Sequence, residues 1–100
     1  MSKYRVFVRP RAWKESKALP GNIRQRVWRA FDAFANEPRP DKTKTLKTSR
    51  TTLEVRRLRL DDWRIVYAIN EELEQVQVLT VQRRPPYDYS NLEELLSEVE

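Results

Sequence analysis

The sequence contains neither cysteine nor histidine among its 100 residues. Without cysteine, the chain can form no disulfides and no thiolate zinc sites. Without histidine, it lacks imidazole-based triads, histidine-containing metal sites and the usual imidazole acid–base pair. Any catalysis must therefore use arginine, lysine, tyrosine or carboxylate side chains, and we expect neither a metal ion nor a cofactor.

Long apolar runs are also missing, since no stretch approaches the length that crosses a membrane. The residues after Met1 are charged and do not resemble a signal peptide. We therefore expect a cytoplasmic protein without membrane contact. With 39% hydrophobic residues, the chain is not disordered in composition, and its length predicts one domain spanning residues 1–100.

The charges are distributed unevenly along the chain. The net charge is +5, but residues 1–60 carry 17 basic and 5 acidic side chains, whereas residues 61–100 carry 3 basic and 10 acidic ones. This asymmetry predicts that one surface binds a polyanion, with nucleic acid as the leading candidate. The alternative is a solvated surface that only keeps the protein soluble.

The first half of the chain predicts a strand followed by two helices. Residues 4–8 alternate in the manner of a strand, and residues 11–17 form a short helix. A longer helix is expected to begin after a cap at Asn22 and to end at Asn36. Its apolar positions recur at helical spacing: Ile23, Val27, Ala30, Phe31 and Phe34. Residues 37–50 are expected to be a loop, either with a short edge strand around residues 45–47 or as a flexible basic linker.

The second half predicts an antiparallel meander of three strands at residues 53–60, 63–69 and 76–83, with acidic turns between them. An amphipathic helix at residues 92–99 follows. The predicted fold is therefore α+β, in the order β-α-α-β-β-β-α. A helical hairpin is expected to pack on one face of a mainly antiparallel sheet, leaving the other face free as a concave, partly polar surface.

Two arginine groups are the candidates for chemistry. In the first, the turn between adjacent strands places Arg59 near Arg64, with Arg56 and Arg57 on the same hairpin. Like charges in this position require an anion or a carboxylate between them. An RNA phosphate suits the guanidinium fork, and we favour this role for Arg64 and a solvated role for Arg56. The carboxylate alternatives are Asp61, Asp62 and Glu54.

The second group is Arg83-Arg84, which precedes two prolines and the tyrosines Tyr87 and Tyr89. Tyrosine rings can stack on unpaired bases, and their hydroxyls can bond to phosphate. Alternatively, one of the two tyrosines packs under the C-terminal helix. The three tryptophans, Trp13, Trp28 and Trp63, are predicted to serve packing rather than base stacking.

These patterns together resemble the RelE/ParE toxin family, and RelE-like members most of all. The most specific stretch is residues 57–67 (RLRLDDWRIVY), followed by residues 79–84 (LTVQRR). Leu19-Pro20 before the long helix and residues 36–40 after it match the helix-flanking residues that are usual in the family. The resemblance implies the toxin of a type II toxin–antitoxin pair that cuts mRNA on the ribosome and is held by a cognate antitoxin.

The resemblance also implies a role for individual residues. Arg64 would stabilise the pentavalent phosphate, and Arg84 would assist the leaving 5′-oxygen. Arg57 would occupy the place of a supporting lysine, and Tyr87, or else Tyr89, would orient the nucleotide. The remaining candidate substrate-binding residues are Arg59, Arg83 and Lys47. The sequence departs from the family pattern at Val55, Gln82, Arg83 and Pro85-Pro86. Two alternatives follow: a ParE-like inhibitor of DNA gyrase, and a non-catalytic member that only binds an antitoxin.

Overall fold

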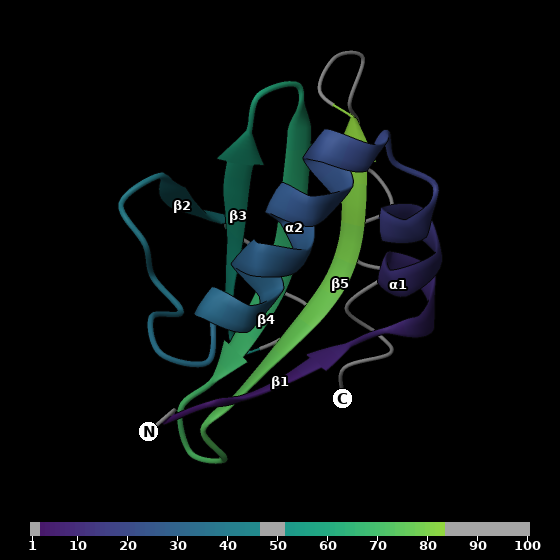
Figure 1. Cartoon of the computed structure of the whole chain (residues 1–100). Helices are drawn as coiled ribbons and strands as arrows, with labels where there is room; N and C mark the ends of the chain where they lie inside the picture. Colours follow the sequence, from purple (N-terminus) through teal and green to yellow (C-terminus); the bar gives the residue numbers. More distant parts are fainter. Residues whose placement is uncertain (1–2, 47–51, 84–100) are drawn as a thin grey trace.

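The computed structural model describes residues 3–46 and 52–83 of the chain. In chain order its elements are β1 (Arg5–Val8), α1 (Pro10–Lys17), α2 (Gly21–Ala33), β2 (Thr43–Leu46), β3 (Glu54–Leu60), β4 (Trp63–Asn70) and β5 (Gln75–Arg83). The five strands form one sheet in the order β1-β5-β4-β3-β2 (Figure 1). Strand β1 runs parallel to β5, and every other neighbouring pair is antiparallel. The chain is therefore a mixed α+β protein, with a five-stranded sheet and two helices among its described residues.

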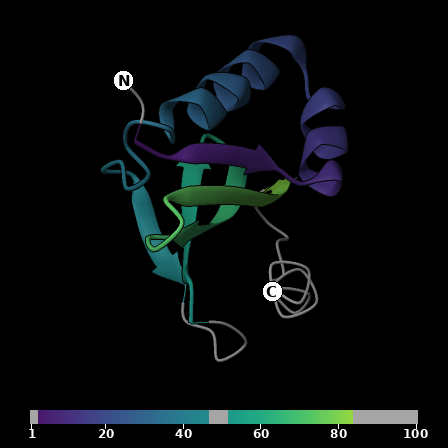
Figure 2. The same ribbon diagram turned by 90° about the horizontal axis from the view of Figure 1, so that it is seen from below.

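Helix α2 lies over one face of this sheet, whereas α1 lies beside β5 at the end of β1, as Figures 1 and 2 show from two directions. The apolar stripe of α2 continues through Phe34 and fills the space between the layers, because its members recur at helical spacing. Val27 and Phe34 are fully buried, and the ring of Phe34 stacks on Tyr67 with centroids 4.1 Å apart. Helix α1 begins at Pro10, whose fixed φ and missing N–H suit the first turn, and lies against β5.

Strand β4 is central and is buried on both faces. Ile65, Tyr67 and Ile69 face the helices and belong to the main core. On the other face, Val66 and Ala68 form a second buried cluster with Val55 and Leu79. The prediction of a free, partly polar face was therefore wrong for the middle of the sheet, where the side chains are apolar and shielded from water.

The three strands of the predicted meander are confirmed as β3, β4 and β5, each starting or ending within one residue of the expected bounds. Asp61, in the first turn, has φ 54°, a left-handed conformation that aspartate tolerates better than most residues. Strand β5 contains an irregularity opposite Val66 and Tyr67, where the register moves by one residue. This β-bulge reverses which side chains of β5 point to each face from that position onward.

Three expectations about the first half need correction. The predicted order omits β2, although a short edge strand around residues 45–47 was one of the two alternatives; the strand lies at Thr43–Leu46 and pairs with β3 in antiparallel register. Helix α2 begins at Gly21, because the Pro20 carbonyl accepts the N–H of Arg24, and Asn22 is therefore not its cap. The helix ends at Ala33 rather than Asn36.

Several predicted features fall outside the described residues. They are the C-terminal helix, Lys47, Arg84, Tyr87 and Tyr89. In the part of the chain that the structure describes, no helix has both the length and the apolar character needed to span a membrane.

Candidate functional site

The arginines of the β3–β4 hairpin gather on the sheet face that the helices do not cover. Leu58 of β3 points into the main core, so the residues on either side of it, Arg57 and Arg59, point to the opposite face. In β4, Ile65 points to the helices, which places Arg64 on the same face as those two arginines. The register sets Arg59 directly opposite Arg64. The predicted proximity of this pair is therefore confirmed.

Arg64 differs from the other two in its burial. It is only 2% exposed, whereas Arg59 is exposed and Arg57 is half-buried. Its neighbours along the same face of β4, Val66 and Ala68, are apolar. Burying a charged group costs free energy that an apolar side chain would not cost. A guanidinium at this position therefore places a buried positive charge on this face of the sheet.

A groove continues this basic surface to the edge of the sheet. It has a volume of about 430 Å³ and lies beside β2 and the turn between β3 and β4. Its charged lining consists of four basic and two acidic residues: Lys42, Lys44, Arg57, Arg59, Asp41 and Asp61. Strand β2 brings Lys44 directly opposite Arg57. The pairing of β2 with β3 is not visible in local periodicity, so the sequence alone does not bring Lys44 beside Arg57.

The bulge in β5 determines which residue of β5 lies next to Arg64 of β4. After the bulge, Gln82 lies opposite Arg64, and Arg83 lies opposite Trp63, which packs against the main core. The register therefore directs Arg83 to the helix-bearing face, and it does not join the other arginines. Of the predicted site residues that the structure describes, it brings together Arg57, Arg59 and Arg64.

Helix α1 holds this bulge in place through one carboxylate. Oε1 of Glu15 accepts a hydrogen bond from the Thr80 hydroxyl at 2.6 Å and another from the Val81 N–H at 3.0 Å. Strand β1 pairs with β5 only as far as Val78. Farther along β5, the Glu15 side chain provides the hydrogen-bond acceptor for the backbone N–H of Val81, because β1 does not pair with β5 there. The carboxylate thus fixes the part of β5 that carries Gln82 toward Arg64.

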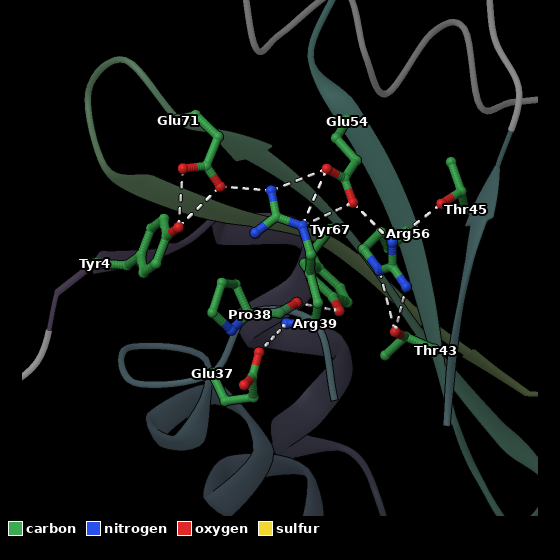
Figure 3. Close-up of polar contacts among 10 residues, drawn as sticks. All are labelled: Tyr4, Glu37, Pro38, Arg39, Thr43, Thr45, Glu54, Arg56, Tyr67 and Glu71. Atoms are coloured by element: carbon green, nitrogen blue, oxygen red, sulfur yellow. Dashed lines mark hydrogen bonds and ion pairs between the residues drawn. The ribbon is translucent and has the colours of Figure 1, made fainter. Parts of the chain in front are cut away.

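Arg56 is not a solvated residue, contrary to expectation. Its side chain is 16% exposed and bonds to the Glu54 carboxylate at 2.7 Å and to the hydroxyls of Thr43 and Thr45 (Figure 3). These contacts join β2 to β3 on the helix-bearing face. Arg56 is therefore a structural residue, and Glu54 is turned away from the pair formed by Arg59 and Arg64.

Arg39 sits at the centre of the same network, between two carboxylates (Figure 3). Its Nη2 lies 2.9 Å from Oε1 of Glu54, its Nε lies 3.1 Å from both Glu54 oxygens, and Nη2 also contacts Glu71. The Tyr4 hydroxyl donates to Glu71 at 2.8 Å. Hydrogen bonds from Arg39 hold the pKa of both carboxyls below their ordinary values, helped by Arg56 at Glu54 and by Tyr4 at Glu71. The same bonds, to Glu54 and then Glu71, raise the pKa of Arg39.

Tyr67 completes the attachment of the connection between α2 and β2. Its buried hydroxyl donates to the Pro38 carbonyl at 2.7 Å. Burial raises the pKa of Tyr67 to about 12, so the phenol stays protonated at neutral pH. Residues 37–43 are therefore fixed to the sheet, and the flexible-linker interpretation was wrong for them. Tyr67 is engaged on the helix-bearing face and does not belong to the arginine face.

Among the described residues, no ion pair joins Asp61 or Asp62 to Arg59. The Asp61 carboxylate forms an ion pair with Arg26 of α2. Within residues 3–46 and 52–83, the ion pairs involve none of Lys42, Lys44, Arg57 and Arg59. The described residues also contain no group of three acidic side chains placed to hold a metal ion. The arginine face is therefore suited to binding an anion through guanidinium and ammonium groups.

Comparisons with known proteins connect this arrangement to toxins. The sequence profile of the family described as "ParE toxin of type II toxin-antitoxin system, parDE" matches residues 6–85. No curated protein sequence matches the chain significantly.

Solved toxin structures share its fold. The archaeal RelE–RelB complex from Pyrococcus horikoshii matches with TM-score 0.75 and 25% identity over 85% of this chain and 99% of that one. The toxin–antitoxin complex RelBE2 of Mycobacterium tuberculosis matches with TM-score 0.66 and 27% identity, over 84% of this chain and 94% of that one. The isolated RelE toxin of E. coli matches with TM-score 0.66 and 19% identity over 97% and 99%, which supports the fold alone.

Proposed function

This chain belongs to the RelE/ParE superfamily of toxins from type II toxin–antitoxin systems, and from that premise we propose that it is a ribosome-dependent mRNA endoribonuclease. The proposed reaction is attack of a ribose 2′-oxygen on the adjacent phosphorus. The bond from phosphorus to the 5′-oxygen breaks, giving a 2′,3′-cyclic phosphate and a free 5′-hydroxyl. Translation stops because the message is cut, and the protein would act in the cytoplasm, where ribosomes and mRNA meet.

The observation that carries this proposal is the convergence of Arg57, Arg59 and Arg64 on one face of β3 and β4. Attack by the 2′-oxygen places additional negative charge on the phosphate oxygens in the transition state. Fixed guanidinium groups stabilise that charge without losing their own proton, and such preorganised electrostatics is a large term in catalysis. The buried Arg64 is proposed to contact the pentavalent phosphate, with Arg57 and Arg59 supporting the substrate.

Proton transfer requires groups beyond the described arginines. Tyr67 cannot act as a base, because its hydroxyl is buried, donates to Pro38 and has a raised pKa. Tyr4 is engaged with Glu71 on the helix-bearing side. We therefore assign the leaving-group role to Arg84 and nucleotide positioning to Tyr87 or Tyr89, all of which lie outside the described residues. Lys47, also outside them, is a proposed substrate contact. Arg83 is not assigned to the substrate, because the register directs it to the other face.

An antitoxin is the proposed protein partner. Two of the similar structures are complexes of RelE-type toxins with their antitoxins. A segment of such a partner that lies over the basic face would neutralise the same side chains that bind RNA. The sequence of the neighbouring gene tests this part of the proposal, because a small acidic protein with a DNA-binding region is expected there.

Primer extension on ribosome-bound mRNA tests the activity. We expect purified protein to produce cuts in the presence of ribosomes, and Arg64→Met to reduce the cleavage rate by at least a hundredfold, in the range found for removing one oxyanion-stabilising donor. Methionine is chosen because it keeps an unbranched apolar side chain in the buried position. Arg29→Met on the exposed surface of α2 is the matched control and should cut like the wild type. Absence of cuts by the wild type, or equal cutting by Arg64→Met, would refute the proposal.

A ParE-like inhibitor of DNA gyrase is the second candidate, and the family profile favours it, because that profile is the one described for ParE toxins. Such a protein acts by binding gyrase and needs no arginine arranged around a phosphate. A supercoiling assay with purified gyrase separates the candidates. Inhibition of supercoiling together with intact mRNA would select this function, and uninhibited gyrase would remove it.

A further inference from the structure

The groove beside β2 contains a pair of like charges that the fold itself places together. Lys44 of β2 stands directly opposite Arg57 of β3 in the antiparallel register. Like charges at opposed positions of a sheet destabilise it, whereas opposite charges stabilise it. Lys42 adds a third positive charge to the same lining. An edge strand optimised for stability alone would carry an acidic residue opposite Arg57.

We propose that this groove is a second phosphate-binding subsite, which holds the single-stranded RNA backbone next to the phosphate at Arg59 and Arg64. The inference rests on the proposed RNA chemistry of that face. Arg57 and Arg59 are two residues apart on one strand, so they are separated by roughly 6–7 Å along it. Successive phosphates of a nucleic-acid strand are separated by a comparable distance. One phosphate at Arg59 and its neighbour between Arg57 and Lys44 therefore follow the direction of β3.

The composition of the lining indicates what the subsite recognises. Among the described residues its lining contains no aromatic side chain, so those residues offer no platform for stacking a base. Lysine and arginine bind phosphate oxygens and carry no sequence information in that role. The subsite therefore contributes affinity that is independent of base sequence, and it leaves base selection to other parts of the complex.

The two acidic residues of the lining affect the subsite differently. The Asp61 carboxylate is neutralised by its ion pair with Arg26. Asp41 is exposed at the end of the groove beside Lys42 and makes no ion pair within the described part of the chain. Its negative charge repels phosphate. Removing that charge should therefore strengthen binding, whereas reversing the charge of Lys44 should weaken it.

The test measures binding without cleavage. The probe is a single-stranded RNA oligonucleotide with 2′-O-methyl riboses, which cannot be cut by 2′-oxygen attack, and affinity is measured without ribosomes over a series of salt concentrations. We expect Lys44→Glu to weaken binding about tenfold or more and to reduce the slope of log affinity against log salt by about one. Asp41→Asn should tighten binding severalfold. Arg29→Glu on α2, which makes the same change in net charge as Lys44→Glu, should alter affinity by no more than about twofold.

A stability measurement on the same variants gives an independent readout. Lys44→Glu places opposite charges across β2 and β3, so its Tm should rise by about 2–5 °C. The subsite is refuted if Lys44→Glu keeps the affinity and salt slope of the wild type, or if Arg29→Glu weakens binding equally. If the variants show these changes in affinity but the wild-type protein cuts no mRNA, the subsite is supported and the nuclease function is refuted. If the wild-type protein cuts mRNA but Lys44→Glu binds RNA with normal affinity, the nuclease function is supported and the subsite is refuted.

Discussion

The bonds between Arg39 and Glu54 make the stability of this fold depend on pH in a defined way. Arg39 attaches the connection between α2 and β2 to the first residue of β3 through a two-pronged contact at 2.9–3.1 Å. Replacing Arg39 with methionine keeps most of the apolar stem and removes the charge. The Glu54 carboxylate then retains Arg56 as a partner but loses the contribution that lowers its pKa most.

The expected loss can be worked from the exposure of the two groups. A hydrogen bond to a charged group contributes about 1.5–3 kcal/mol when it is shielded from water. Arg39 and Glu54 are 34% and 30% exposed in their side chains, so solvent screening reduces this to about 1–2 kcal/mol at neutral pH. The contact with the exposed Glu71 is screened by water and does not enter this magnitude. For a chain of this length the loss corresponds to a fall in Tm of about 5–15 °C.

The pH dependence follows from the direction of the pKa shift. The folded protein holds the pKa of Glu54 below its ordinary 4.5, so the stabilisation is fully present above pH 4.5. It is lost as the pH falls through the depressed value in the folded protein, because protonation removes the charge that Arg39 binds. The difference in unfolding free energy between wild type and Arg39→Met should therefore be constant from pH 7 to pH 5.5 and should shrink toward pH 3.

Urea unfolding at several pH values measures this difference directly. Arg29→Met serves as the control, because that exposed arginine belongs to none of the ion pairs among the described residues. Its unfolding free energy should follow that of the wild type at every pH. The reasoning fails if Arg39→Met is as stable as the wild type at pH 7, or if the gap at pH 3 equals the gap at pH 7.

Three further changes test other contacts by the same unfolding assay. Tyr67→Phe should cost about 1–2 kcal/mol, because it leaves a buried backbone carbonyl without its donor; a loss below about 0.3 kcal/mol would argue against that bond. Glu15→Ala should cost about 1–3 kcal/mol and speed hydrogen exchange at the Val81 amide, whereas unchanged exchange would show that the carboxylate does not hold the bulge. Glu74→Gly should stabilise the protein by about 0.5–1 kcal/mol, because Glu74 adopts φ 52°; a lower midpoint than the wild type would contradict this explanation.

Much of the fold was predictable because it depends on local periodicity. The helical spacing of Val27, Phe31 and Phe34 identified the buried stripe of α2. Alternation identified the three strands of the meander, and the short acidic turn between the first two placed Arg59 opposite Arg64. These features depend only on residues that are close in the sequence, so they can be predicted without information about distant contacts.

The parts that were missed, or given only as one of two alternatives, depend on pairing between distant segments. Strand β2 is short and polar, and it is stabilised by its register with β3 rather than by an apolar pattern. The role of Arg56 depends on that pairing, since two of its partners belong to β2. The placement of Arg83 depends on a bulge that a carboxylate of α1 fixes, and strict alternation along β5 cannot reveal such a shift.

The central claim is that the arginine face supports attack by a ribose 2′-oxygen on mRNA in the ribosome. Cleavage of two matched messages tests it most directly: one all-RNA, and one with a single 2′-deoxyribose at the nucleotide whose 2′-oxygen would attack. We predict that the wild-type protein cuts the first message, leaving a 2′,3′-cyclic phosphate, and leaves the second intact at that position. Equal cutting of both messages, or of neither, would contradict the account.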